Sequence, residues 1–158
     1  MADNNQLKQA QIVYKTMKEM FDARGLAYEA DDENLTVYSG AKGEDLPVGI
    51  RMRVDPERML IVAHSQLPFE VPVNRRLETA IAVSRANYGL PDGSFDYDFL
   101  TGNIVFRMTS CYRDSLIGQE LFEYMFVVSY GIVDDYNDLL EKAATTDMSV
   151  DEIMKAIK

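Results

Sequence analysis

The sequence contains carboxylates at a spacing that could bind a metal ion or serve an acid–base reaction. Asp96 and Asp98 are two residues apart in "DGSFDYDFLTG", which begins with Asp92. Side chains two apart in a strand share one face, and hard cations prefer oxygen ligands. The segment lacks the further ligands of an EF-hand loop, however, and position 100 is leucine. We interpret these aspartates as solvated outer residues of a hairpin, with weak metal contact at Asp96 and Asp98 as the alternative.

The other reactive residue types form no catalytic pattern. His64, the only histidine, ends an apolar stretch and could act as a general base near neutral pH. No G-x-S-x-G motif surrounds a serine, and no phosphate-binding glycine loop, H-E-x-x-H or C-x-x-C motif is present. We interpret His64 as structural and Cys111, the only cysteine, as a buried or half-buried structural residue. The sequence therefore predicts no catalytic residue, no metal site and no cofactor.

The aspartates lie in a stretch whose alternation predicts a β-hairpin. Apolar residues recur at every second position on both sides of "TGN". A turn at "TG" places Asp96 opposite Arg107, a turn at "GN" places Asp98 there instead, and both registers remain open. In either register the same residues face the core, because cross-strand partners share a side. These are Phe95, Tyr97, Phe99, Ile104, Phe106 and Met108.

The periodicity of the rest of the chain predicts the elements around this hairpin. Apolar residues at three- and four-residue steps predict helices at 7–24, 73–88 and about 118–144, and a short C-terminal helix with a capping box at Ser149 and Glu152. Alternating residues predict strands at 35–38, 48–54 and 59–64, the last ended by prolines. The connections are too short for parallel crossovers. We therefore predict one α+β domain over residues 1–158, an antiparallel sheet covered by helices in the order α-β-β-β-α-β-β-α plus the short helix.

The helix at 73–88 has two apolar stripes. We predict that one faces the sheet: Leu77, Ala80, Ile81, Ser84 and Tyr88. The other consists of Thr79, Ala82, Val83 and Ala86, where a helix that only covered a sheet would carry charge. Small residues allow close approach, so we predict a homodimer that pairs this second stripe with its own copy. The alternative is that the long C-terminal helix or the loop at 89–94 covers it within one chain.

Charge and composition limit the partners. The net charge is −10, and Arg51, Arg53, Arg75 and Arg76 are the only local basic concentrations, which argues against binding to nucleic acid. One cysteine excludes an intramolecular disulfide, and no signal peptide or membrane-spanning stretch is visible. We therefore expect a cytoplasmic protein without a membrane partner. Nine methionines could adapt a surface to apolar partners, but six of them are predicted to fill the core: Met17, Met20, Met52, Met59, Met108 and Met125.

The segment "VPVNRRLETAIAVSRANYGLPDGSFDYDFLTGNIVFRM" resembles the YbjN family, described as bacterial sensory-transduction regulators. A proline-opened helix that ends in Asn leads into a "G-x-F/Y-x-x-D" strand, a tight turn and a second strand that ends in arginine. The matching positions are Pro72, Asn87, Phe95, Asp98, Gly102 and Arg107. The order of elements is similar to the type III secretion chaperone-like fold. The resemblance implies that fold, dimers through this region and no catalytic residues; the terminal "SVDEIMKAIK" looks like an addition.

Two functions follow from these observations. The first is a non-enzymatic, chaperone-like binding protein that holds an apolar segment of a partner protein, kept soluble by its acidic charge. The alternative is a regulatory module in signalling or stress response that recognises a protein or a small ligand. An enzyme ranks third.

Overall fold

Six strands form one antiparallel sheet in the computed structural model, which describes residues 2–44 and 47–157. The strands are β1 (Tyr28–Asp31), β2 (Thr36–Lys42), β3 (Pro47–Asp55), β4 (Leu60–Glu70), β5 (Ser94–Tyr97) and β6 (Asn103–Cys111). Their order is β1-β2-β3-β4-β6-β5, so β5 lies at an edge. The predicted α+β class with an antiparallel sheet is confirmed. Strand β1, which pairs with β2, was not predicted from the sequence.

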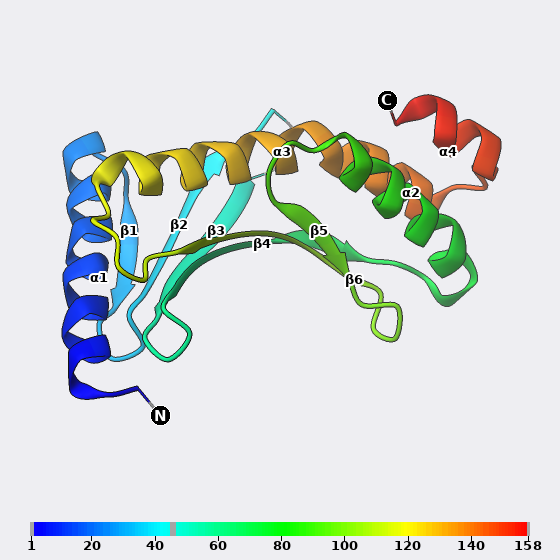
Figure 1. Cartoon of the computed structure of the whole chain (residues 1–158). Coiled ribbons are helices and arrows are strands. Elements are labelled where there is room, and N and C mark those ends of the chain that lie inside the picture. Colours follow the sequence, from blue (N-terminus) through cyan, green and yellow to red (C-terminus); the bar gives the residue numbers. More distant parts are fainter. Residues whose placement is uncertain (1, 45–46, 158) are drawn as a thin grey trace.

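The helices gather on one side of this sheet. They are α1 (Asn4–Arg24), the short 3₁₀ helix η1 (Val73–Arg75), α2 (Arg76–Gly89), α3 (Gln119–Thr145) and α4 (Val150–Ala156). Figure 1 shows the strands bending into an arch, with α3 above it, α1 at one end, and α2 and α4 at the other. In the described part of the chain, no helix lies under the arch. The sheet therefore has a covered face and an open face.

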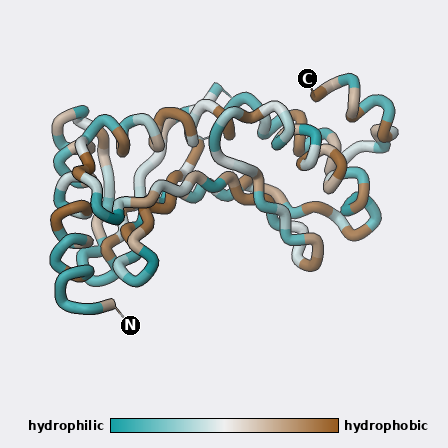
Figure 2. Tube along the Cα trace, in the orientation of Figure 1, coloured by the Kyte–Doolittle hydropathy of each residue, from teal (hydrophilic) through white to brown (hydrophobic). Residues whose placement is uncertain are grey.

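The alternating residues of the strands explain why only one face is covered. Met52 on β3 and Phe106 on β6 are fully buried against the helices, whereas Arg51 and Arg53 beside Met52 are exposed. Figure 2 shows this mixture of hydrophobic and hydrophilic residues along the arch. All six methionines assigned to the core are buried, which confirms that prediction.

Local signals set the end of α1 and the start of α4 as predicted, although α1 begins at Asn4, three residues before its predicted start. Gly25 follows α1 with φ of 64°, a left-handed conformation that glycine adopts without strain. At α4, the Ser149 side chain accepts from the backbone N–H of Glu152, whose carboxylate accepts from the Ser149 N–H in return. This is the predicted capping box, and the long helix α3 likewise begins and ends within a residue of its predicted bounds.

The hairpin has a register that differs from both predicted alternatives. Phe95 pairs with Phe106 and Tyr97 with Ile104. The loop is longer than expected, closed by a bond from the Gly102 N–H to the Asp98 carbonyl oxygen (2.7 Å). The shift is an even number of residues, so the same side chains still face the core. One exception is Phe99, which lies in the loop and is 50% exposed; its assignment to the core was wrong.

Two further predictions about strand ends were wrong. The prolines do not end β4 at residue 64, because the strand continues through Pro68 to Glu70. The ladder with β6 is interrupted between Gln66 and Glu70, and there the missing N–H of Pro68 is tolerated. Cys111 is exposed rather than buried, since the odd-numbered residues of β6 point to the open face.

Candidate functional site

The hairpin aspartates each have their own structural partner. Asp96 accepts two hydrogen bonds from the Arg107 guanidinium, at 2.5 and 3.0 Å, and these chiefly hold the pKa of Asp96 below its usual value. Asp98 accepts from the Thr101 hydroxyl (2.8 Å) within its own loop, which likewise lowers the pKa of Asp98. Asp92 accepts from a tyrosine hydroxyl on α3. The three carboxylates do not converge, and among the described residues no group of three or more His, Cys, Asp or Glu could hold a metal ion.

The stripe of small residues on α2 that was predicted to pair with a second copy is buried inside the chain. Thr79, Ala82, Val83 and Ala86 are buried within the chain, where α2 contacts β5, α3 and α4. Leu77 and Tyr88, expected to face the sheet, are 66% and 84% exposed. The two faces are therefore the reverse of the prediction, and the four buried residues cannot form an interface with a second copy. Small residues face inward because they let α2 approach its neighbours closely.

The outward face of α2 forms an apolar surface together with α4. We call it the α2–α4 surface; it consists of Val73, Leu77, Ala80, Ile81, Tyr88 and Met154. A cleft of about 490 Å³ lies within it, lined by Ile81, Tyr88 and Met154 among others. Arg85 joins the two helices, since its Nε donates to the Ile157 carbonyl oxygen (3.0 Å) at the end of α4.

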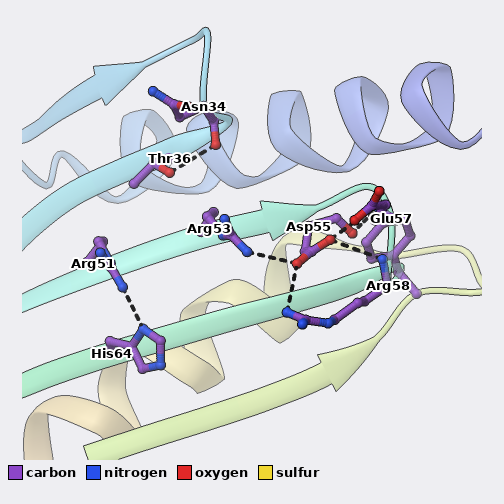
Figure 3. Close-up of polar contacts among 9 residues, drawn as sticks. Asn34, Thr36, Arg51, Arg53, Asp55, Glu57, Arg58 and His64 are labelled. Atoms are coloured by element: carbon purple, nitrogen blue, oxygen red, sulfur yellow. Dashed lines mark hydrogen bonds and ion pairs between the residues drawn. The ribbon is translucent and has the colours of Figure 1, made fainter. Parts of the chain in front are cut away.

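The open face of the sheet is the second exposed region, and it is hollowed. One hollow of about 790 Å³ extends from Tyr38 to Tyr97, and a second of about 470 Å³ extends toward Arg58. Arg51 and His64 line both hollows and so stand where the two adjoin. Figure 3 shows their side chains on neighbouring strands of this face.

Asp55 neutralises two arginines at one end of the open face. Its Oδ2 accepts from Arg53 (2.7 Å) and forms an ion pair with Arg58 (3.6 Å). Its Oδ1 accepts from the backbone N–H groups of Glu57 and Arg58, both at 3.0 Å. The carboxylate thus holds the β3–β4 turn and cancels nearby positive charge, as Figure 3 shows.

Arg51 has a different partner, the imidazole of His64. The two residues lie directly opposite each other in the β3–β4 register, and Arg51 Nη2 is 2.9 Å from His64 Nδ1. A guanidinium has only donors, so Arg51 donates and Nδ1 accepts, which requires a neutral ring protonated at Nε2. Burial, then the charges of Arg51 and Arg107, lower the pKa of His64 and favour that neutral form. This pair could not be predicted from the sequence, because only the register of β3 against β4 brings the two residues together.

The chain is similar to one protein family in sequence and to solved structures in fold. A protein-family model matches residues 14–142 and carries the description "Putative bacterial sensory transduction regulator". The chain belongs to the YbjN family. Two solved structures share the fold: one is described as "YbjN, a putative transcription regulator from E. coli" (TM-score 0.58, 14% identity, 83% of this chain and 91% of that one). The other is a chain of the ExsC–ExsE complex (TM-score 0.54, 17% identity, 81% of this chain and 92% of that one).

These matches confirm the secretion-chaperone-like fold that the resemblance implied. No curated protein matches the chain. Across the part of this YbjN-family chain that the structure describes, no helix has the length and apolar character needed to cross a membrane.

The YbjN-motif positions make contacts inside the fold. The Asn87 side chain, at the end of α2, donates to the Phe95 carbonyl oxygen (2.9 Å) and accepts from the Phe95 N–H (2.7 Å). The two bonds attach α2 to the outer edge of β5, which has no neighbouring strand in the part of the chain that the structure describes. Phe95 itself is buried, with its ring 5.2 Å from that of Phe106 in an edge-on arrangement. Arg107 binds Asp96, as described above.

The remaining YbjN-motif residues position the hairpin loop. Gly102 has φ of 86°, and a Cβ there would lie 2.5 Å from the Val71 carbonyl oxygen. The Val71 N–H donates to the Gly102 carbonyl oxygen (2.9 Å), and Pro72 then begins the turn into α2. Arg76 on α2 donates to the Leu100 carbonyl oxygen (2.7 Å). The loop is thus held against the connection from β4 to α2.

Proposed function

We propose that this protein is a non-enzymatic binding module that holds an apolar segment of a partner protein on the α2–α4 surface. The observation that carries the proposal is the exposure of large apolar side chains on a helix whose inner face is already buried. Leu77 and Tyr88 are exposed, although a helix that only covered a sheet would show charge to water at such positions. The cleft beside Ile81 and Met154 has the size and apolar lining of a binding site.

The comparison with the ExsC–ExsE complex supports protein binding of this general kind. A chain of similar fold occurs there in complex with another protein. The family description as a sensory transduction regulator is compatible with the same activity, because a regulator can act by holding a partner.

The test compares the parent with a double variant, Leu77→Asp with Tyr88→Asp. Both side chains are exposed, so the fold should tolerate the change. The parent should raise the fluorescence of a hydrophobic dye and retain a defined partner in pull-downs from the native cell, and the variant should lose both. The matched control is Ile12→Asp with Val127→Asp, which places the same charges at exposed apolar positions on α1 and α3. Equal retention of the partner by the parent and the α2 variant would contradict the proposal.

The homodimer remains a proposal, now on the opposite face of α2 from the one predicted. A second copy on the α2–α4 surface would cover the cleft, so it would compete with a partner segment. Light scattering separates the two occupants. A mass near 17.9 kDa would show that the surface is free for a partner protein. A mass of about twice that value, reduced to the monomer mass in the Leu77→Asp, Tyr88→Asp variant, would show that a second copy occupies the surface.

The second candidate function is a regulatory module that recognises a small ligand. The Arg51–His64 pair between two hollows of the open face favours it. A thermal shift with a single small molecule, unaffected by the α2 substitutions, would support this function over partner binding.

A further inference from the structure

The smaller hollow of the open face is mostly positive, in contrast to the protein as a whole. The chain has a net charge of −10, yet Arg51, Arg53, Arg58 and Arg107 line the smaller hollow, and Asp55 is the only acidic residue that the described part of the chain places there. Three of these arginines already have a carboxylate: Arg53 and Arg58 share Asp55, and Arg107 binds Asp96. Arg51 is the exception. Among the described residues its guanidinium has no carboxylate partner, only the imidazole of His64.

We propose that Arg51 and His64 bind the anionic head of a small organic molecule, a phosphate or a carboxylate, whose apolar body lies in the larger hollow. A neutral His64 with its proton on Nε2 presents one donor, and Arg51 presents the N–H groups that it does not use on Nδ1. Guanidinium groups bind carboxylate and phosphate with charge-assisted hydrogen bonds. The site thus offers several donors and a guanidinium that forms no ion pair with any described carboxylate.

The larger hollow is suited to the rest of such a molecule. Its volume of about 790 Å³ is within the range of small-molecule sites. Tyr38 and Val105 line it beside Arg51 and His64, so an aromatic or aliphatic body could contact their apolar atoms while its anionic head stays at Arg51. Asp96 and Asp98 also line this hollow, where Asp96 is paired with Arg107 and Asp98 accepts from Thr101 of its own loop. No residue of the α2–α4 surface takes part, so this site is independent of the proposed partner binding.

His64 provides a direct readout because it is the only histidine of the chain. The charged groups around it are Arg51 and Arg53 on β3, Arg107 on β6 and Asp96 on β5; the arginines lower its pKa and Asp96 raises it. A bound anion adds negative charge near the ring and should raise the pKa of His64 from its lowered value. The imidazole signals in a proton NMR spectrum should therefore move on binding.

The experiment titrates the protein with phenyl phosphate, benzoate and inorganic phosphate while following the His64 signals. We expect saturable shifts and a raised pKa of His64, with phenyl phosphate or benzoate binding more tightly than inorganic phosphate because of the apolar body. Comparison of phenyl phosphate with benzoate identifies which head group is preferred. The absence of a saturable shift with all three probes would overturn the site, and equal binding of phenyl phosphate, benzoate and inorganic phosphate would overturn the role of the larger hollow.

Substitution locates the binding. Arg51→Gln should weaken it about tenfold or more, equivalent to about 1.4 kcal/mol. Arg113→Gln, which removes the same charge from an exposed loop, should leave it unchanged. Thermal unfolding checks that Arg51→Gln is folded; if it is not, Arg51→Lys, which keeps the charge but loses the planar donor group, takes its place. Unchanged binding in a folded Arg51 variant would overturn the proposal.

Discussion

The two faces of the sheet are built from neighbouring residues and do different work. On β6, Phe106 is fully buried under the helices, and the next residue, Arg107, lies on the open face in an ion pair with Asp96. On β3, Met52 lies in the core between two exposed arginines. One face buries apolar area and supplies the stability of the fold. The other keeps charge in contact with water and is free to bind, so substitutions one residue apart should differ sharply in effect.

The largest difference in stability is expected between substitutions on the two faces of β6. Phe106→Ala should lower the free energy of unfolding by about 3–5 kcal/mol, because it leaves a cavity beside Phe95 in the core. Val105→Ala, on the open face of the same strand, should cost less than about 1 kcal/mol. Urea denaturation measures both. A Phe106→Ala protein within about 1 kcal/mol of the parent would mean that the covered face does not carry the stability.

A smaller loss of stability is expected when the hydrogen bonds between α2 and β5 are removed. Asn87→Ala removes both side-chain hydrogen bonds to the Phe95 backbone and should cost about 1–3 kcal/mol, since those backbone groups lose their partner. Asn74→Ala is the control, because Asn74 is an exposed amide on η1. The measurement is again denaturation, and a similar small loss for both variants would argue against a structural role for the Asn87 bonds.

The ion pair on the open face should have a still smaller effect that depends on pH. The pKa of Asp96 is lowered in the folded protein, so the pair stabilises the fold above the ordinary aspartate pKa of about 3.9. That contribution is lost as the pH falls through the lowered pKa. Asp96→Asn should therefore cost less than about 1 kcal/mol at neutral pH and nothing once Asp96 is protonated. Unfolding curves at both pH values check this, and a pH-independent cost would show that charge is not the cause.

No change is expected from metal removal. The carboxylates of the hairpin bind arginine, hydroxyl and backbone groups rather than one another, so a chelator should leave the melting temperature unaltered. Thermal unfolding with and without EDTA is the measurement. A drop of about ten degrees would reveal a metal that contributes to folding.

Features that depend only on neighbouring residues could be predicted from the amino-acid sequence. The ends of α1 and α4 follow from a glycine and a capping box, which act within a single turn. The inner face of the hairpin follows from strict alternation, and this alternation held even though the register of Phe95 was wrong. The YbjN motif was also readable, because Asn87, Gly102 and Arg107 occur at characteristic positions along the chain.

Features that depend on contacts between elements distant in the sequence could be found only in the folded chain. Both stripes of α2 are apolar, so periodicity could not tell which is buried; the close contact with α3 selected the small residues around Ala82 and Ala86. The Arg51–His64 pair depends on the register between β3 and β4, which no single strand contains. Pro68 stays in β4 because the ladder is interrupted beside it. Local spacing determines which residues of an element share a face, but only packing determines which face is covered.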